Sequence, residues 1–149
     1  MSFSGILIAN RGEIAIRIAR AASDLGIRSV AVFSSDDESS LHVIKSDERV
    51  LLPGKGAAAY LDMDSIISAA KKNNCDAIHP GYGFLSEQAD FAKKCELEGV
   101  TFIGPKEKHL RLFGDKGAAR DAARSASVPV LNGINQPITL EEAESFFED

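Results

Sequence analysis

Short apolar runs alternate with segments of helical periodicity through the first hundred residues, and this alternation leaves few folds open to the chain. An apolar run at residues 5–9 is followed by apolar side chains at helical spacing as far as Leu25, and Gly26 ends that segment. A second apolar run, at residues 29–33, then indicates another strand. The order strand, helix, strand is typical of a parallel pair.

The same alternation recurs in the middle of the chain. Asp62 is a good N-cap for a second helix, and a third is expected over residues 86–98 with Ser86 as its cap. Short buried strands are expected at residues 77–78 and 100–103. The sequence therefore predicts an α/β fold with a doubly wound parallel sheet.

The sequence changes character after Ile103. Residues 104–105, Gly-Pro, interrupt the strand, and a charged stretch follows at residues 106–111. We place a domain boundary between residues 113 and 114 and expect a second, truncated domain after it. Beyond the boundary we expect a helix, a strand and an acidic capped helix, at residues 117–125, 128–131 and 139–147.

Composition excludes several classes of protein. The 149 residues carry 17 Lys and Arg against 22 Asp and Glu, and the net charge of -5 argues against a nucleic-acid partner. No apolar run approaches the roughly 18 to 20 residues of a membrane span, and the start lacks a secretion signal, so we expect a cytoplasmic protein that does not bind membranes. Cys75 and Cys95 stand apart and are predicted to be core thiols rather than metal ligands.

Candidate chemistry lies in loops after strands, because ligands of open parallel sheets bind beyond the carboxyl ends of the strands. In the first loop, ANRGEIA at residues 9–15, free N–H groups at a helix start could hold an anion, or Gly12 could simply allow a tight turn. A dinucleotide site would need GxGxxG, which is missing. Asp36 and Asp37 stand where a ribose-binding acid would, but acids are common in polar loops.

The second loop is HPGYGFLSE, residues 79–87. Gly81 and Gly83 leave room around Tyr82, so backbone could approach a ligand while the ring offers a flat wall. The alternative is that the glycines only shape a turn and the tyrosine packs. His79 is expected to be a hydrogen-bonded packing residue.

The third loop is GDK, residues 114–116. Lys116, just inside a helix start, is placed to meet a phosphate as a point charge, although most such lysines are only solvated. Residues 53–60, PGKGAAAY, lack the glycine and lysine spacing of a P-loop and are predicted to be a flexible loop.

Five segments in this order resemble the biotin carboxylase family: ANRGEIA, the SSDD loop followed by His42-Val43, HPGYGFLSE, FIGP and GDK. The likeness covers about residues 4–129. It implies that residues 1–113 form a Rossmann-like pre-ATP-grasp domain, and that residues 114–149 are the truncated beginning of an ATP-grasp domain.

The resemblance also implies an activity, that of an ATP-dependent carbon–nitrogen ligase. The family uses ATP and bicarbonate to make carboxyphosphate and then carboxylates biotin on a carrier domain, with Mg²⁺ or Mn²⁺ on the nucleotide phosphates. By resemblance, Lys116 is an ATP-contacting lysine, Tyr82 and Gly83 belong to the loop beside the biotin and bicarbonate pocket, and Glu87 belongs to the same motif. The family's catalytic residues and metal ligands would lie beyond Asp149, so we expect the fragment alone to be inactive and to bind no cofactor tightly.

The implied partners are a biotin carboxyl carrier domain and a carboxyltransferase domain. The family includes acetyl-CoA and other acyl-CoA carboxylases of fatty acid metabolism, and pyruvate and urea carboxylases; the acceptor is chosen outside this segment. The first helix, with Arg17 and Arg20, resembles a surface used in family homodimers, so a homo-oligomer is expected. Two alternatives stay open: a stand-alone binding or dimerisation module without catalysis, and another ATP-grasp ligase such as half of a carbamoyl-phosphate synthetase.

Overall fold

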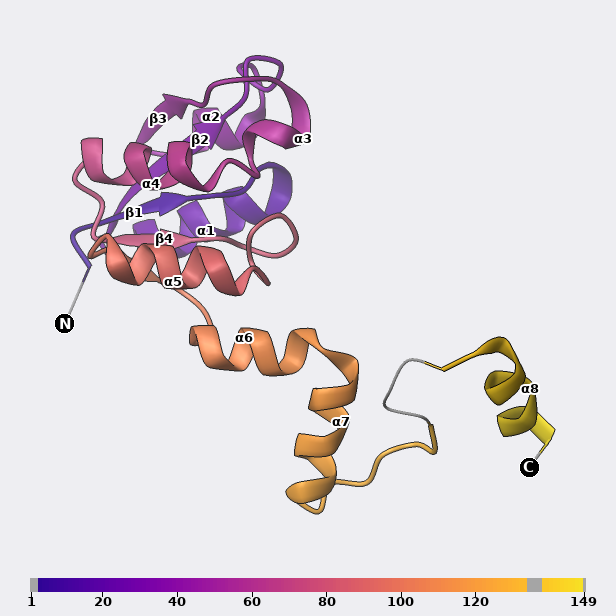
Figure 1. Ribbon diagram of the computed structural model, residues 1–149. Coiled ribbons are helices and arrows are strands. Elements are labelled where there is room, and N and C mark those ends of the chain that lie inside the picture. The colour runs from indigo at the N-terminus through magenta and orange to yellow at the C-terminus, as the bar shows by residue number, and fades with distance from the viewer. Residues whose placement is uncertain (1–2, 134–137, 149) are drawn as a thin grey trace. The chain divides into compact units, whose positions relative to one another are not determined.

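The computed structural model describes residues 3–133 and 138–148 (Figure 1). The chain divides into two compact units, Met1–Glu107 and Lys108–Asp149. The first unit is the predicted α/β domain, and the second is helical in its described residues. None of the helices in the described part of the chain is long and apolar enough to cross a membrane.

A five-stranded, all-parallel sheet forms the centre of the first unit, with strand order β3-β2-β1-β4-β5. The predicted doubly wound parallel fold is therefore confirmed. The strands are β1 (Gly5–Ile8), β2 (Arg28–Phe33), β3 (Glu48–Leu51), β4 (Ala77–His79) and β5 (Thr101–Phe102).

Helices cover both faces of this sheet, because successive side chains of a strand point to opposite sides. On the central strand β1, Leu7 packs with α4 and α5, whereas Ile6 and Ile8 pack with α1. Figure 1 shows α1 on one side of the sheet and α4 and α5 on the other. The helices of this unit are α1 (Gly12–Asp24), α2 (Leu41–Lys45), α3 (Gly56–Ala59), α4 (Met63–Lys72) and α5 (Ala89–Leu97).

The three long helices of the first unit end in the same way. Gly26 after α1, Asn74 after α4 and Gly99 after α5 all adopt left-handed conformations, with φ of 68°, 51° and 72°. The next N–H then bonds back to a carbonyl five residues earlier, as from Ile27 to Ala22 at 2.8 Å. This closes each helix with its last carbonyls satisfied and returns the chain to the sheet.

Several local predictions in the first unit are confirmed and others are wrong. Asp62 caps α4, since its carboxylate accepts from the Ser65 N–H at 3.1 Å. Ser86 does not cap α5, which begins later with Gln88 at the N-cap position. The predicted flexible loop at residues 53–60 contains the short helix α3, and strand β3 was not predicted at all.

The second unit contains α6 (Glu107–Gly114), whose first residue closes the first unit, α7 (Lys116–Ser125) and α8 (Leu140–Glu148). The predicted helices at residues 117–125 and 139–147 are confirmed, and Thr139 caps α8 by accepting from the Glu142 N–H at 3.2 Å. The strand predicted at residues 128–131 is wrong, because that segment pairs with no strand in the described chain. Along the chain, the first compact unit ends at Glu107 and the second begins at Lys108. The domain boundary between residues 113 and 114 stays a prediction.

Candidate functional site

The strand order of the sheet reverses at its centre, between β1 and β4. From β1 the chain passes to α1 on one face of the sheet, and from β4 it passes to α5 on the other face. The loops that follow these two neighbouring strands therefore begin next to each other, at the carboxyl ends of the strands. The loop after β1 is ANRGEIA and the loop after β4 is HPGYGFLSE, here called the GYG loop (residues 79–87). Two of the three loops singled out from the sequence thus lie side by side.

Asn10 joins these two loops. Its side-chain Nδ2 donates to the carbonyl of Pro80 at 2.7 Å and to that of Tyr82 at 2.8 Å, while its Oδ1 accepts from the N–H of Arg11 at 2.8 Å. The side chain is buried, with 3% of Asn10 exposed. Every amide atom of Asn10 is therefore used to hold the GYG loop against the start of α1.

The GYG loop turns sharply because three of its residues are left-handed. Gly81, Gly83 and Phe84 have φ of 67°, 66° and 42°. A Cβ on Gly81 would lie 2.7 Å from Asn10 Nδ2, whereas a Cβ on Gly83 would meet no atom within 4 Å. Gly81 is therefore required by close packing, and Gly83 leaves open space that a ligand could enter.

Tyr82 stands between these glycines and is 62% exposed, so the alternative in which its ring packs into the fold is wrong. Its hydroxyl donates a short hydrogen bond to Glu13 on α1, and this bond raises the pKa of Tyr82. On the other side of the turn, Phe84 stacks on Tyr60 and Leu85 is buried. The loop is thus held on both flanks while its aromatic tip faces solvent.

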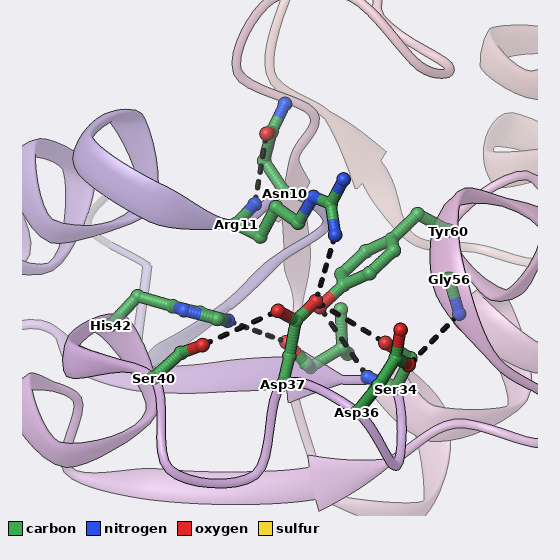
Figure 2. Close-up of polar contacts among 10 residues, drawn as sticks. Asn10, Arg11, Ser34, Asp36, Asp37, Ser40, His42, Gly56 and Tyr60 are labelled. Atoms are coloured by element: carbon green, nitrogen blue, oxygen red, sulfur yellow. Dashed lines mark hydrogen bonds and ion pairs between the residues drawn. The ribbon is translucent and has the colours of Figure 1, made fainter.

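The carboxylates of the acidic loop after β2, residues 34–37, bond to other parts of the first unit (Figure 2). Asp37 Oδ2 accepts from the Tyr60 hydroxyl at 2.8 Å and pairs with Arg11 Nη1 at 3.1 Å. Burial alone would raise the pKa of Asp37, but these hydrogen bonds outweigh it and lower that pKa. Asp36 accepts from the Gly56 N–H at 2.9 Å. Both carboxylates therefore act within the fold, which argues against a ribose-binding acid.

The histidines near this edge serve packing. His79 Nδ1 accepts from the Gly81 N–H at 3.0 Å, and burial lowers the pKa of its imidazole. His42 is 1% exposed, with Nε2 3.3 Å from the Val32 carbonyl oxygen, and burial also lowers its pKa. The structure agrees with the prediction that His79 is a hydrogen-bonded packing residue.

The family described as biotin carboxylase, N-terminal domain, matches residues 2–110. The chain belongs to this family. Its biotin carboxylase relationship explains why ANRGEIA and HPGYGFLSE occur together, and it confirms the resemblance stated from the sequence.

Longer proteins share this biotin carboxylase domain. The chain is 54% identical to a pyruvate carboxylase of Bacillus subtilis (strain 168) over 97% of its length, which is 13% of that protein. It superposes with a TM-score of 0.93 on the biotin carboxylase domain of a single-chain bacterial carboxylase, at 52% identity over 97% of this chain and 34% of that one. It also superposes on the biotin carboxylase domain of the Hydrogenobacter thermophilus 2-oxoglutarate carboxylase, solved with MgADP, ADP and bicarbonate, with a TM-score of 0.95 at 38% identity over 99% of this chain and 33% of that one.

The four residues assigned from the biotin carboxylase resemblance fall in both units. Tyr82, Gly83 and Glu87 lie on the GYG loop, and all three are exposed. Lys116 is the first residue of α7 in the second unit and is exposed, with the Asp115 carboxylate accepting from the Ala118 N–H at 2.8 Å. That cap already uses one of the N–H groups expected to be free at this helix start.

Two further site residues were missed from the sequence, Asn10 and Glu13. Both belong to ANRGEIA, but their partners lie about seventy positions later in the chain. Their position after an apolar strand was the available signal, since that places them at the ligand edge of the sheet. In the described part of the chain, no group of three or more His, Cys, Asp or Glu side chains could hold a metal ion.

Proposed function

We propose that this chain is the amino-terminal domain of a longer biotin-dependent carboxylase, in which it forms part of the ATP- and bicarbonate-dependent biotin carboxylase. The observation that carries the proposal is the exposed Tyr82 ring on a firmly held glycine turn, at the reversal point of a sheet that belongs to this family. A flat ring beside backbone without side chains suits a planar ureido ring system.

The proposed reaction has two steps. A bicarbonate oxygen attacks the γ-phosphorus of ATP, a P–O bond forms, and the bond to ADP breaks, which gives carboxyphosphate. A ureido nitrogen of biotin then forms a bond to the carboxyl carbon as the bond from that carbon to the phosphate oxygen breaks, and the leaving phosphate takes up the proton that the nitrogen loses. In this scheme Tyr82 and Gly83 line the biotin side, Glu87 borders the same loop, and Lys116 contacts the ATP phosphates as a point charge.

Mg²⁺ or Mn²⁺ would supply charge neutralisation on the nucleotide phosphates. Within the described residues, no group of three or more His, Cys, Asp or Glu side chains could hold such an ion. We further propose that the 149-residue chain by itself is catalytically inactive and binds ATP weakly, because Lys116 alone would leave the phosphates in water. Calorimetry with ATP and an assay for bicarbonate-dependent ADP release test this; micromolar affinity or turnover by the pure chain would contradict it.

The proposed setting is a cytoplasmic homo-oligomer with carrier and carboxyltransferase domains. An apolar groove of about 510 Å³ beside α1, with Leu25 74% exposed at its rim, supports a contact with further polypeptide. Whether the whole enzyme serves pyruvate or an acyl-CoA is decided by its carboxyltransferase.

The deciding experiment uses the full-length protein and radiolabelled bicarbonate with free biotin as acceptor. We expect ATP-dependent fixation of label into biotin. Tyr82→Ala should raise the KM for biotin and leave the KM for ATP within about twofold, and Lys116→Ala should do the reverse. Absence of biotin-dependent fixation by the wild-type protein would refute the proposed function and favour a non-catalytic module.

A further inference from the structure

Arg11, the residue before α1, pairs with Asp37 of the acidic loop (Figure 2) and also faces the ring of Phe84 in the GYG loop. Its guanidinium carbon is 5.5 Å from the centroid of the Tyr60 ring and 5.8 Å from that of Phe84. The same guanidinium pairs with Asp37 at 3.1 Å, and its side chain is 40% exposed. One cation thus faces two aromatic rings and one carboxylate.

Asp37 is itself fixed in place. Its Oδ2 accepts from the Tyr60 hydroxyl at 2.8 Å and from Ser34 Oγ at 3.2 Å, and its Oδ1 accepts from Ser40 Oγ at 3.3 Å. Its side chain is only 18% exposed. The carboxylate therefore determines where the Arg11 guanidinium sits.

Phe84 connects Arg11 and Tyr60 to the GYG loop. Its ring stacks on Tyr60 with centroids 5.2 Å apart, and its backbone is left-handed with φ of 42°. A side chain other than glycine stays in that conformation only when its surroundings hold it there. Phe84 follows Tyr82 by two residues, so its position sets the end of the turn that displays the tyrosine.

We infer that Arg11 is a positioning residue for biotin: held by Asp37, it fixes Phe84 against Tyr60 and so keeps the GYG loop in the shape that presents Tyr82. The inference rests on the proposed function, since it names a residue that acts on the same site through another. Arg11 contacts neither biotin nor ATP in this scheme.

The test uses the full-length carboxylase with free biotin as acceptor and measures the KM for biotin and the KM for ATP separately. Arg11→Met keeps the length of the side chain and removes its charge. We expect the KM for biotin to rise about tenfold and the KM for ATP to stay within about twofold, because only the biotin-side loop loses its support. Arg11→Lys, which keeps the charge, should recover part of the affinity for biotin.

Ser40→Ala is the matched control, because it removes a hydrogen bond from the other oxygen of Asp37 and leaves both rings untouched. It should leave both KM values within about twofold of wild type. If Arg11→Met does not fold, Phe84→Leu, which removes the ring below the guanidinium, is judged by the same two constants. A biotin KM within twofold of wild type in the folded variant, or an equal rise in both constants, would overturn the inference. A wild-type enzyme that does not carboxylate biotin would instead overturn the proposed function.

Discussion

The single neutral side chain of Asn10 makes three hydrogen bonds where the GYG loop lies against the start of α1. Its two donated bonds replace water at two loop carbonyls. Because the side chain is buried, a replacement that cannot donate both bonds should lower the free energy of unfolding. Asn10→Asp puts a buried carboxylate where two carbonyl oxygens require a donor. We expect the free energy of unfolding to fall by about 3 kcal/mol.

Urea denaturation followed by circular dichroism measures this change. Asn73→Asp is the control, since the half-buried Asn73 donates only one bond, at 2.8 Å to the Ala69 carbonyl at the end of α4, and its loss should cost about 1 kcal/mol. Equal losses at the two positions would show that Asn10 does not hold the loop.

Alanine substitutions at Gly81 and Gly83 of the GYG loop allow the cost of backbone strain to be measured apart from the cost of a steric clash. Alanine at either position must adopt a left-handed conformation, which costs about 1 kcal/mol. Only Gly81→Ala also forces a methyl group against the Asn10 amide, which two hydrogen bonds keep from moving away. Gly81→Ala should therefore destabilise the chain by about 1 to 2 kcal/mol more than Gly83→Ala. Matched denaturation curves for the two variants decide this, and indistinguishable midpoints would contradict it.

At the residue scale, the sequence indicated which loops matter but not how they are held. The glycine turn around Tyr82 followed from residue type and spacing, whereas the exposure of the Tyr82 ring was one of two alternatives that the sequence left open. The partners of Asn10 and Arg11 did not, because Pro80 and Asp37 reach them only through strand pairing across the sheet. A hydrogen bond between residues 70 positions apart has no signature in a single sequence.

Helix α4 owes its start to Asp62. The carboxylate accepts from the Ser65 N–H at 3.1 Å and from the Ser65 hydroxyl at 2.6 Å. Asp62→Ala should lower the free energy of unfolding by about 1 kcal/mol. Gln88→Ala is the comparison, because Gln88 precedes α5 without a side-chain cap and should change stability by less than about 0.5 kcal/mol. A loss at Asp62 no larger than that at Gln88 would show that the cap contributes little.

Elements with a buried, uninterrupted apolar pattern were predicted well, and elements without one were not. Strand β3 escaped prediction because it lies at the sheet edge and its residues, beginning with Glu48 and Arg49, are mostly exposed. Helix α3 is only one turn long and begins at a glycine. Residues 128–131 have the composition of a strand, but a strand needs a neighbour, and the described chain provides none there.

On the scale of the whole molecule, the two hydrophobic clusters found among the described residues both lie within the first unit. One cluster packs α4 and α5 on the sheet and the other packs α1, and neither uses a residue beyond Ile103. Residues 1–107 should therefore fold without the second unit, with a melting temperature within about 5 °C of the complete chain. Calorimetry on both proteins checks this; a broad, non-cooperative transition in the shorter protein would contradict it.

Acid should weaken the fold in two stages. Burial lowers the folded-state pKa of His42 and His79, so below about pH 6.5 the unfolded chain binds more protons than the folded one and stability falls as pH falls. Near and below about pH 4 the carboxylates whose pKa is lowered, Asp37 and Asp47, add a second loss for the same reason.

Urea unfolding at pH 7.5 and 5.5 tests the first stage. The difference between the two pH values should shrink in His42→Gln, with His109→Gln as the control because His109 is exposed on α6. An unchanged difference in His42→Gln would mean that the imidazole of His42 does not contribute.

The strand order has a further consequence for how this domain is made in the cell. β1 leaves the ribosome before the other strands of its sheet, yet its neighbour β4 begins only at Ala77. Until β4 has been synthesised, one edge of β1 has no partner strand, and the GYG loop that Asn10 holds has not yet been made. The sheet therefore cannot be completed during translation before β4 has been synthesised. A nascent chain stalled before β4 would expose an unpaired strand edge that chaperones could bind and that could lead to aggregation.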